Sequence, residues 1–290
     1  MRPVATHASP VVTHASPAPL GAPLGAPLLS LLLSLAAAGC PGASNGPASD
    51  TVSGTIEVKG RVVDFESCIT GSGCLGVPDV KVGLFSEPSI FSAKTAPSGT
   101  FAITNAPVGS PTYLYVYDVG GSGTYLSSLQ VEPVALQGSG VYGLELFALK
   151  RQGALFSGII KEAKVNVQTH PLYIGQVFKV EQGSMKALPD VSIQSTPAAE
   201  IRYVNCISTF SQCAGQPTLF ASRSSTGQFG QFVVISKSAS GTTHTITATG
   251  TGYSFKSAKA PLGLGYVTIG VHRASGSGAS DAAVPKEGGP

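Results

Sequence analysis

The sequence has little charge, no tryptophan and no long hydrophobic run. Of its 290 residues 11% are charged, and the formal net charge is +3. A nucleic-acid-binding surface needs clustered Lys and Arg, so this small and scattered charge indicates that nucleic acid is not a partner. A permanent transmembrane helix needs about 20 apolar residues, and the apolar run at 28–39 is shorter than that.

Motifs for catalysis and metal binding are also missing. The five histidines form no His-x-His or His-Glu-x-x-His pattern, and neither an EF-hand run nor a nucleophile elbow between a strand and a helix is evident. The segment 53–150 contains no histidine, and His170, His244 and His272 lie far apart in the sequence. A lone histidine on an alternating strand, as at His244, is more often a surface residue than a ligand. We therefore predict no cofactor, no metal and no enzyme activity.

What the sequence does contain is a short apolar run that ends in a cysteine. The stretch 28–38 has the length of a signal-peptide core, roughly 7–15 residues, and small residues follow it. The closing Ala37-Ala38-Gly39-Cys40 resembles the lipobox of bacterial lipoproteins. The resemblance implies that residues 1–39 are a signal peptide and that Cys40 is lipidated, for example with palmitate. An ordinary secretory signal that contains a cysteine is the alternative.

The lipobox resemblance also implies a location. The chain is expected in the bacterial cell envelope, where its lipid anchor makes the membrane a partner. Pro41 rather than Asp follows the cysteine, which in enteric members of that family favours the outer membrane. The segment 40–52 has no apolar period and is predicted to be a flexible tether, and the Gly/Ser/Ala-rich segment 274–290 is predicted to be a disordered tail.

The four remaining cysteines predict two local disulfides. Cys68 lies close to Cys74 in the sequence, and Cys206 lies close to Cys213. In an exported chain such close pairs favour disulfides within each pair. A four-cysteine zinc site is the alternative, although neither spacing is the two-residue gap typical of such sites. No Cys-x-x-Cys motif supports a redox function.

Between tether and tail the composition is typical of short strands joined by tight turns. The chain has 36 Gly and 21 Pro, and its apolar segments are short and rich in Val, Ile, Tyr and Phe. Turn signals recur about every ten residues, which is the spacing of a β-sandwich. No amphipathic helix is predicted after the leader. We predict an all-β fold with one sandwich domain at 53–150 and another at 151–273.

The two blocks carry the same motifs in the same order. In each, a Pro-Asp-Val strand entrance precedes a Gly-x-Phe turn, and the predicted strand at 155–160 opens the second block. The copies are Val77-Pro78-Asp79-Val80, Gly99-Thr100-Phe101 and Asn105-Ala106-Pro107-Val108-Gly109 in the first block, and Leu188-Pro189-Asp190-Val191 and Gly227-Gln228-Phe229 in the second. Gly99 and Gly227 suit a backbone position with positive φ, and Phe101 and Phe229 suit a sandwich core.

This order of motifs resembles the carboxypeptidase regulatory-like domain. The resemblance implies two tandem Greek-key sandwiches of the transthyretin-like, or prealbumin-like, type. Domains of that family often occur as accessory modules in secreted and surface proteins, so we predict a non-catalytic, envelope-anchored binding or scaffolding module. A carbohydrate-binding surface lipoprotein is the alternative. In it Tyr113, Tyr115 and Tyr117, which share one strand face, form a stacking platform, unless they simply pack the sandwich. The expected partner is thus a protein or a polysaccharide.

Overall fold

The computed structural model describes residues 54–70, 73–109, 111–117, 123–131, 134–181, 184–207, 213, 215–220 and 223–276. The predicted signal peptide, Cys40, the tether and residues 277–290 of the predicted tail lie outside these described residues. Residues 274–276, which were expected in the tail, are instead the end of a strand.

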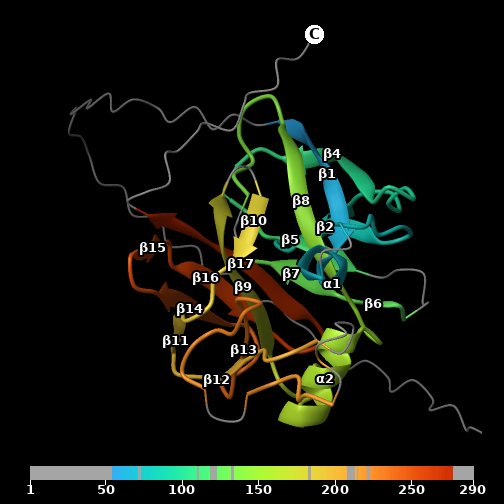
Figure 1. Ribbon diagram of the computed structural model, residues 1–290. Coiled ribbons are helices and arrows are strands. Elements are labelled where there is room, and N and C mark those ends of the chain that lie inside the picture. The colour runs from blue at the N-terminus through green and yellow to red at the C-terminus, as the bar shows by residue number, and fades with distance from the viewer. Residues whose placement is uncertain are drawn as a thin grey trace, which may run out of the picture. The chain divides into compact units, whose positions relative to one another are not determined.

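The described chain is built mostly from β-strands in three sheets, which confirms the predicted all-β sandwich fold (Figure 1). A four-stranded sheet has the order β4-β1-β8-β6, and a three-stranded sheet has the order β11-β14-β16. A ten-stranded sheet has the order β12-β13-β9-β17-β7-β5-β2-β3, with β10 paired to β9 and β15 paired to β17. The strands are β1 (Thr55–Asp64), β2 (Lys81–Leu84), β3 (Glu87–Phe91), β4 (Thr100–Pro107), β5 (Leu114–Tyr117), β6 (Tyr125–Leu126), β7 (Ser128–Gln130), β8 (Val141–Lys150), β9 (Leu172–Glu181), β10 (Ser184–Ala187), β11 (Ser192–Thr196), β12 (Glu200–Tyr203), β13 (Gln231–Ile235), β14 (Thr242–Thr249), β15 (Tyr253–Phe255), β16 (Ala258–Leu262) and β17 (Val267–Gly276), and the α-helices are α1 (Phe65–Ile69) and α2 (Ala154–Ala163).

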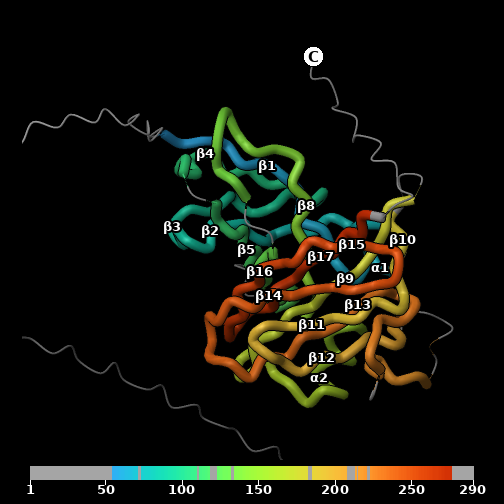
Figure 2. The backbone as a smooth tube through the Cα atoms, turned by 90° about the vertical axis from the view of Figure 1, so that its left-hand side faces the viewer, coloured from blue at the N-terminus to red at the C-terminus, as the bar shows by residue number. Residues whose placement is uncertain are grey.

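The two smaller sheets cover opposite faces of the ten-stranded sheet. Across the ten-stranded sheet, Tyr115 of β5 pairs with Leu129 of β7, and Leu129 pairs with Thr268 of β17. Thr268 in turn pairs with Tyr173 of β9, so these four residues lie on one face of the sheet. On that face Tyr173 packs with residues of β11, β14 and β16. The reverse face carries Val116, which packs with residues of β1, β4 and β8. Two sandwiches thus share one continuous sheet (Figure 2). The parallel pairing of β7 with β17 joins its two halves.

Three apolar cores follow from this arrangement. The first lies inside the first sandwich and contains Phe101, which confirms the core position predicted for that residue. The second lies between the three-stranded sheet and the ten-stranded sheet. The third packs α2 and Phe65 of α1 against the ten-stranded sheet, on the side of the first sandwich, where Ile174 and Ile269 point. The third core therefore draws residues from both halves of the chain.

Helix α2 stands where the sequence predicted a strand at 155–160, and the expectation of no helix after the leader was wrong. Leu155 and Ile159 are four residues apart, so they lie on one helical face, and both are fully buried. The carboxylate of Glu66 accepts hydrogen bonds from the backbone N–H groups of Ala154 (3.0 Å) and Leu155 (3.4 Å). This distant side chain satisfies the first N–H groups of the helix, which otherwise lack a partner within it.

The strand that opens the second sandwich is β9 rather than the segment 155–160. β9 pairs antiparallel with β13 and parallel with β17, just as β1 pairs antiparallel with β4 and parallel with β8. β14 pairs antiparallel with β11, as β5 does with β2. The pairing pattern therefore supports the internal repeat that the motifs indicated.

A buried threonine in each sandwich makes the same set of hydrogen bonds. The hydroxyl of Thr95 accepts from the N–H of Val80 (3.1 Å) and donates to the carbonyl of Val77 (2.7 Å). The hydroxyl of Thr226 accepts from the N–H of Val191 (3.0 Å) and donates to the carbonyl of Leu188 (2.8 Å). These matching networks align the two copies at Thr95 and Thr226.

This alignment corrects the predicted register of the second Gly-x-Phe turn. Gly99 follows Thr95 by four residues and has a φ of +84°, and Gly230 follows Thr226 by four residues and has a φ of +63°. Gly227 is not among the glycines with positive φ. Phe232 fills the second core, whereas Phe229 is only partly buried. The sequence reading was displaced by three residues because the second copy contains two glycines and two phenylalanines at the same spacing.

Candidate functional site

The predicted tyrosine platform lies on the open face of the first sandwich's half of the ten-stranded sheet. Tyr115 and Tyr117 point away from the first core, while the alternating Leu114 and Val116 point into it. Tyr113 lies at the start of the same strand and is also partly exposed. The structure therefore brings the three predicted tyrosines together on the outside of the sandwich rather than in its core.

Three further aromatic residues extend this surface into what we call the aromatic strip. Phe85 and Phe91 come from the neighbouring segment around β2 and β3 and are 39% and 42% exposed, and Tyr266 precedes β17. The centroid of the Tyr115 ring lies 6.2 Å from that of Phe85 and 5.9 Å from that of Tyr266. The strip consists of Phe85, Phe91, Tyr113, Tyr115, Tyr117 and Tyr266.

The rings of the strip cover one another in part. Tyr115 and Tyr117 are stacked, with centroids 5.6 Å apart and planes at 24°. Phe91 meets Tyr117 edge to face at 6.2 Å, and the ammonium of Lys81 lies 4.0 Å from the centroid of Phe91. Gly83 lies beside them, where a Cβ would contact Tyr117 and Phe91 at 3.4–3.6 Å. A ligand would therefore meet ring edges, hydroxyl groups and the two exposed phenylalanines more than bare tyrosine faces.

The hydroxyl groups of the strip are uncharged at neutral pH. Burial raises the pKa of Tyr115, although a hydrogen bond with Ser127 opposes that rise. Burial and then the nearby Tyr115 raise the pKa of Tyr266 to about 12. The phenol of Tyr113 donates to the backbone carbonyl of Lys259 on β16, at 3.4 Å. The strip therefore offers apolar area and neutral hydrogen-bonding groups, with the ammonium of Lys81 over the ring of Phe91.

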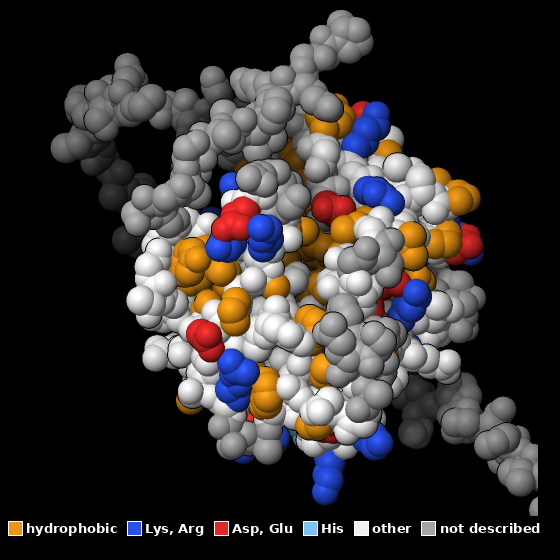
Figure 3. Space-filling model, viewed as in Figure 1, with side chains coloured by type: hydrophobic (Ala, Val, Ile, Leu, Met, Phe, Trp, Pro, Cys, Tyr) orange, Lys and Arg blue, Asp and Glu red, His pale blue; other side chains and the backbone are white. Residues whose placement is uncertain are grey.

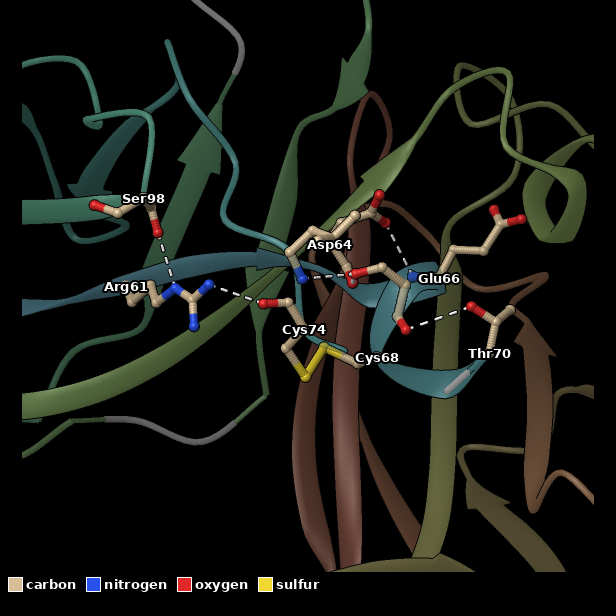
Figure 4. Close-up of a disulfide and its surroundings, with 9 residues drawn as sticks. Arg61, Asp64, Glu66, Cys68, Thr70, Cys74 and Ser98 are labelled. Carbon is tan, nitrogen blue, oxygen red and sulfur yellow. Dashed lines mark hydrogen bonds between the residues drawn. A yellow bond between two sulfur atoms is a disulfide. The ribbon is translucent and has the colours of Figure 1, made fainter. Parts of the chain in front are cut away.

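The predicted disulfides are present. Cys68 is bonded to Cys74 and Cys206 to Cys213. Figure 4 shows the first of these at the end of α1, beside Arg61 of β1. The guanidinium of Arg61 donates from Nε to the carbonyl of Ser98 and from Nη2 to the carbonyl of Cys74, both at 2.8 Å. The disulfide loop is therefore tied to the first sandwich.

A polar cluster beside this disulfide joins α1 to β8 and α2. Asp64, whose side chain is almost fully buried, accepts from the N–H of Glu66 (3.0 Å) and forms an ion pair with Lys150 (2.6 Å). Burial raises the pKa of Glu66, while its hydrogen bonds to the start of α2 oppose that rise. At the other end of α2, the carboxylate of Glu162 accepts from the N–H groups of Thr218 and Leu219, both at 2.6 Å. These contacts hold α2 against the rest of the fold. The carboxylates of Glu66 and Glu162 are engaged by backbone N–H groups.

His244 is fully buried, which corrects the expectation that it lies on the surface. Its ring nitrogens lie 2.8 Å from the hydroxyl of Ser195 and 2.9 Å from that of Ser236. The hydroxyl of Ser195 also donates to the carbonyl of Pro197 at 2.9 Å, so its proton is already engaged. Among the described residues no carboxylate contacts His244. The arrangement holds a buried imidazole and does not activate a serine nucleophile.

His272 is also buried and hydrogen-bonded, in the middle of β17. Its Nε2 lies 2.7 Å from the phenol oxygen of Tyr173. Burial lowers the pKa of His272 to about 4, although a hydrogen bond to the backbone of Lys256 opposes this. His170, as predicted, lies in a loop before β9, and it is half-buried. The contacts of His244 and His272 could not be predicted from the sequence, because their partners lie outside their own strands.

Neither a metal-binding cluster nor a membrane-spanning helix occurs in the described part of the chain. No group of three or more His, Cys, Asp or Glu side chains there could hold a metal ion. No helix in the described ranges is long and apolar enough to span a membrane. Figure 3 shows one face of the molecule, on which the few charged side chains lie among hydrophobic and uncharged ones.

Comparison with known proteins gives only remote neighbours. No family model and no curated protein matches the chain. Among solved structures, the Bacillus anthracis TIE protein is 11% identical, with a TM-score of 0.24, over 76% of this chain and 34% of that one. The shaft pilin SpaA from Lactobacillus rhamnosus GG is 11% identical, with a TM-score of 0.22, over 77% and 98%. The minor pilin GBS52 of Streptococcus agalactiae is 10% identical, with a TM-score of 0.24, over 79% and 100%.

This chain thus spans about a third of the TIE protein. TM-scores at this level support no argument about function, and the fold assignment rests on the strand pairing described above. The resemblances to the lipobox and to the carboxypeptidase regulatory-like domain stay predictions from the sequence.

Proposed function

We propose that this chain is a non-catalytic binding or scaffolding module, anchored in the bacterial cell envelope through a lipid on Cys40. The aromatic strip carries the proposal, because Phe85, Phe91 and the three tyrosines at 113–117 form one partly exposed aromatic surface on a sheet in which β2 and β5 are paired on both sides. Aromatic residues on a rigid frame supply contact area at little entropic cost. The run before Cys40 supplies the predicted anchor.

The anchor is tested by metabolic labelling of the full chain with palmitate. Label is expected in the wild type and in Cys213→Ser, which removes a disulfide cysteine and serves as the control. Label should disappear in Cys40→Ala. Label that persists in Cys40→Ala would show that Cys40 is not the lipidated residue.

The binding surface is tested by affinity capture from envelope extracts with wild type, Tyr115→Ala and Tyr142→Ala as bait. Tyr142 is 56% exposed and lies outside the strip, so it is a matched control. Proteins or polysaccharides retained by wild type and Tyr142→Ala but not by Tyr115→Ala support the strip. Equal capture by all three places the binding surface elsewhere.

Carbohydrate binding by the strip is the second candidate. The observation in its favour is the combination of partly exposed aromatic rings with tyrosine hydroxyls that stay neutral, a surface that suits the C–H faces and hydroxyls of a sugar. A glycan array probed with the same three proteins separates this candidate from a protein partner. Saturable binding that Tyr115→Ala loses and Tyr142→Ala keeps supports it, and no binding to any glycan rejects it.

A further inference from the structure

Both buried histidines lie in the second sandwich, one on each side of its core. His244 is on β14 of the three-stranded sheet, and its inward-facing neighbours Ile246 and Ala248 belong to the second core. His272 is on β17 of the ten-stranded sheet, and its ring lies 5.6 Å from that of Phe232 in the same core. Their relative exposures are 0% and 3%.

Burial favours the neutral form of His244. The hydroxyl of Ser195 donates to a backbone carbonyl, so it can only accept from Nδ1–H of the ring. The hydroxyl of Ser236 lies 2.9 Å from Nε2 and accepts the N–H of Ser238 (3.0 Å). Burial lowers the pKa of His244, although a hydrogen bond to the backbone of Pro197 opposes this.

His272 lies beside uncharged side chains, and its one contact that favours a charge is the hydrogen bond to the backbone of Lys256. Tyr173 of β9 presents its phenol to the His272 ring, and Phe232 of β13 presents its ring. Tyr203 of β12, whose hydroxyl accepts the N–H of Ile193, belongs to the same core. The buried carboxylates among the described residues, Asp64 and Glu66, lie at α1 in the other half of the chain.

The first sandwich is built without histidine. No histidine occurs between residues 53 and 150, and its core consists of apolar side chains. Between pH 7.5 and 5, where an ordinary histidine gains its proton, the first core holds no imidazole and the second holds two. The buried carboxylates of the first half, Asp64 and Glu66, lie at α1.

We propose that the second sandwich is an acid-sensitive element, in which protonation of His244 and His272 separates the three-stranded sheet from the ten-stranded sheet while the first sandwich stays closed. Two like charges in one apolar core, without a carboxylate partner, strongly disfavour the closed form. The direction follows from linkage: both rings bind protons more weakly when buried than when exposed, so acid favours the open state.

Opening also changes the aromatic strip. The phenol of Tyr113 donates to the carbonyl of Lys259 on β16, the strand of the three-stranded sheet that lies next to the strip. Lifting β16 away removes that contact and uncovers the sheet beside Tyr113. This consequence for ligand binding rests on the proposed function, whereas the acid opening itself does not.

Hydrogen–deuterium exchange of the full chain at pH 7.5 and pH 5, corrected for intrinsic exchange rates, tests the proposal without any ligand. An ordinary His pKa of 6.5 and a buried value of about 4 for His272 predict that this residue alone raises the opening equilibrium about 30-fold at pH 5. Faster exchange is expected in β11, β14 and β16, and unchanged exchange in β1 and β4. Equal acceleration in both sandwiches, or in neither, would overturn the proposal.

Variants assign the effect to these two rings. The double variant His244→Gln/His272→Gln keeps polar groups at both sites but cannot titrate, so the pH effect on β14 and β16 should fall by at least tenfold. His170→Gln, at the loop histidine of the same half, which lies outside the second core, should keep the full effect. Loss of the effect in His170→Gln would contradict the proposal. If the double variant does not fold, the midpoint of opening in the wild type decides: it must lie below pH 6.5, and a midpoint at neutral pH or above excludes the buried rings.

Discussion

Replacing the matched threonines with valine tests whether the two sandwiches are stabilised by the same local device. Thr95 and Thr226 are 4% and 0% exposed, and each hydroxyl joins a strand entrance to the turn that follows it. Valine has nearly the same shape as threonine, so Thr95→Val and Thr226→Val remove the hydroxyl and create almost no cavity. The expected loss is therefore a loss of hydrogen bonding rather than of packing.

The size of the loss follows from the groups left unpaired. Each substitution deletes one accepted and one donated hydrogen bond of 2.7–3.1 Å and leaves a buried N–H and a buried carbonyl without that partner. Burying an unsatisfied group costs about 1–3 kcal/mol. Because the carbonyl retains a second lone pair for other partners, we expect each variant to lose about 2–4 kcal/mol of unfolding free energy.

Denaturant unfolding of wild type and variants at one pH measures these losses through the shift in midpoint. Thr95→Ser and Thr226→Ser keep the hydroxyl and lose only a methyl group, so each should lose only about 1 kcal/mol. The exposed Thr251 provides a surface control, and Thr251→Val should stay within about 0.5 kcal/mol of wild type. The reasoning fails if either buried valine variant is as stable as wild type, or if the serine variants lose as much as the valine variants.

Three further predictions concern the cap of α2, the second disulfide and the buried His272. Glu66→Gln removes the charge and one acceptor from the start of α2, so thermal unfolding should show a loss of about 1–2 kcal/mol; an unchanged midpoint would contradict this role. Cys206→Ser/Cys213→Ser opens a short loop and should cost about 2 kcal/mol by the same measurement, and a variant as stable as wild type would contradict it. His272 has a folded-state pKa of about 4 against an ordinary 6.5, so its contribution is complete above pH 6.5 and is lost as the pH falls toward 4, by about 3 kcal/mol. A pH titration of stability measures this, and a flat profile from pH 6.5 to 4 would refute it.

Local signals in the sequence were sufficient for the fold class, the disulfides and the shared strand face of the tyrosines, but they left open whether that face points outward or into the sandwich. Alternation in β5 places Tyr115 and Tyr117 on one face and Val116 on the other, and that pattern needs no knowledge of the rest of the chain. The two cysteine pairs each span a short segment. Each of these features depends on residues close together in the sequence.

Features that depend on distant residues could not be predicted in this way. The six apolar and small residues at 155–160 fit a strand or a helix equally well, and the choice is made by Glu66, 88 residues before Ala154, and by packing in the third core. Tyr266 joins the aromatic strip only because the parallel pairing of β17 with β7 brings it beside Tyr115. Phe85, in contrast, continues the outward alternation of β2 and was open to prediction.

The displaced register of the second Gly-x-Phe turn can itself be tested with alanine at three glycines. At Gly99 and Gly230 φ is positive, and an added Cβ would overlap the backbone carbonyl oxygen of Val62 or Val177. At Gly227 φ is not positive, and the nearest atom would lie 3.0 Å from the Cβ. Left-handed strain costs about 1–2 kcal/mol and the overlap adds to it, so Gly99→Ala and Gly230→Ala should each lose more than about 2 kcal/mol in denaturant unfolding. Gly227→Ala should lose about 1 kcal/mol or less. If Gly227→Ala proves the more damaging of the two changes in the second copy, then Gly227 is the counterpart of Gly99 and the alignment through the buried threonines is wrong.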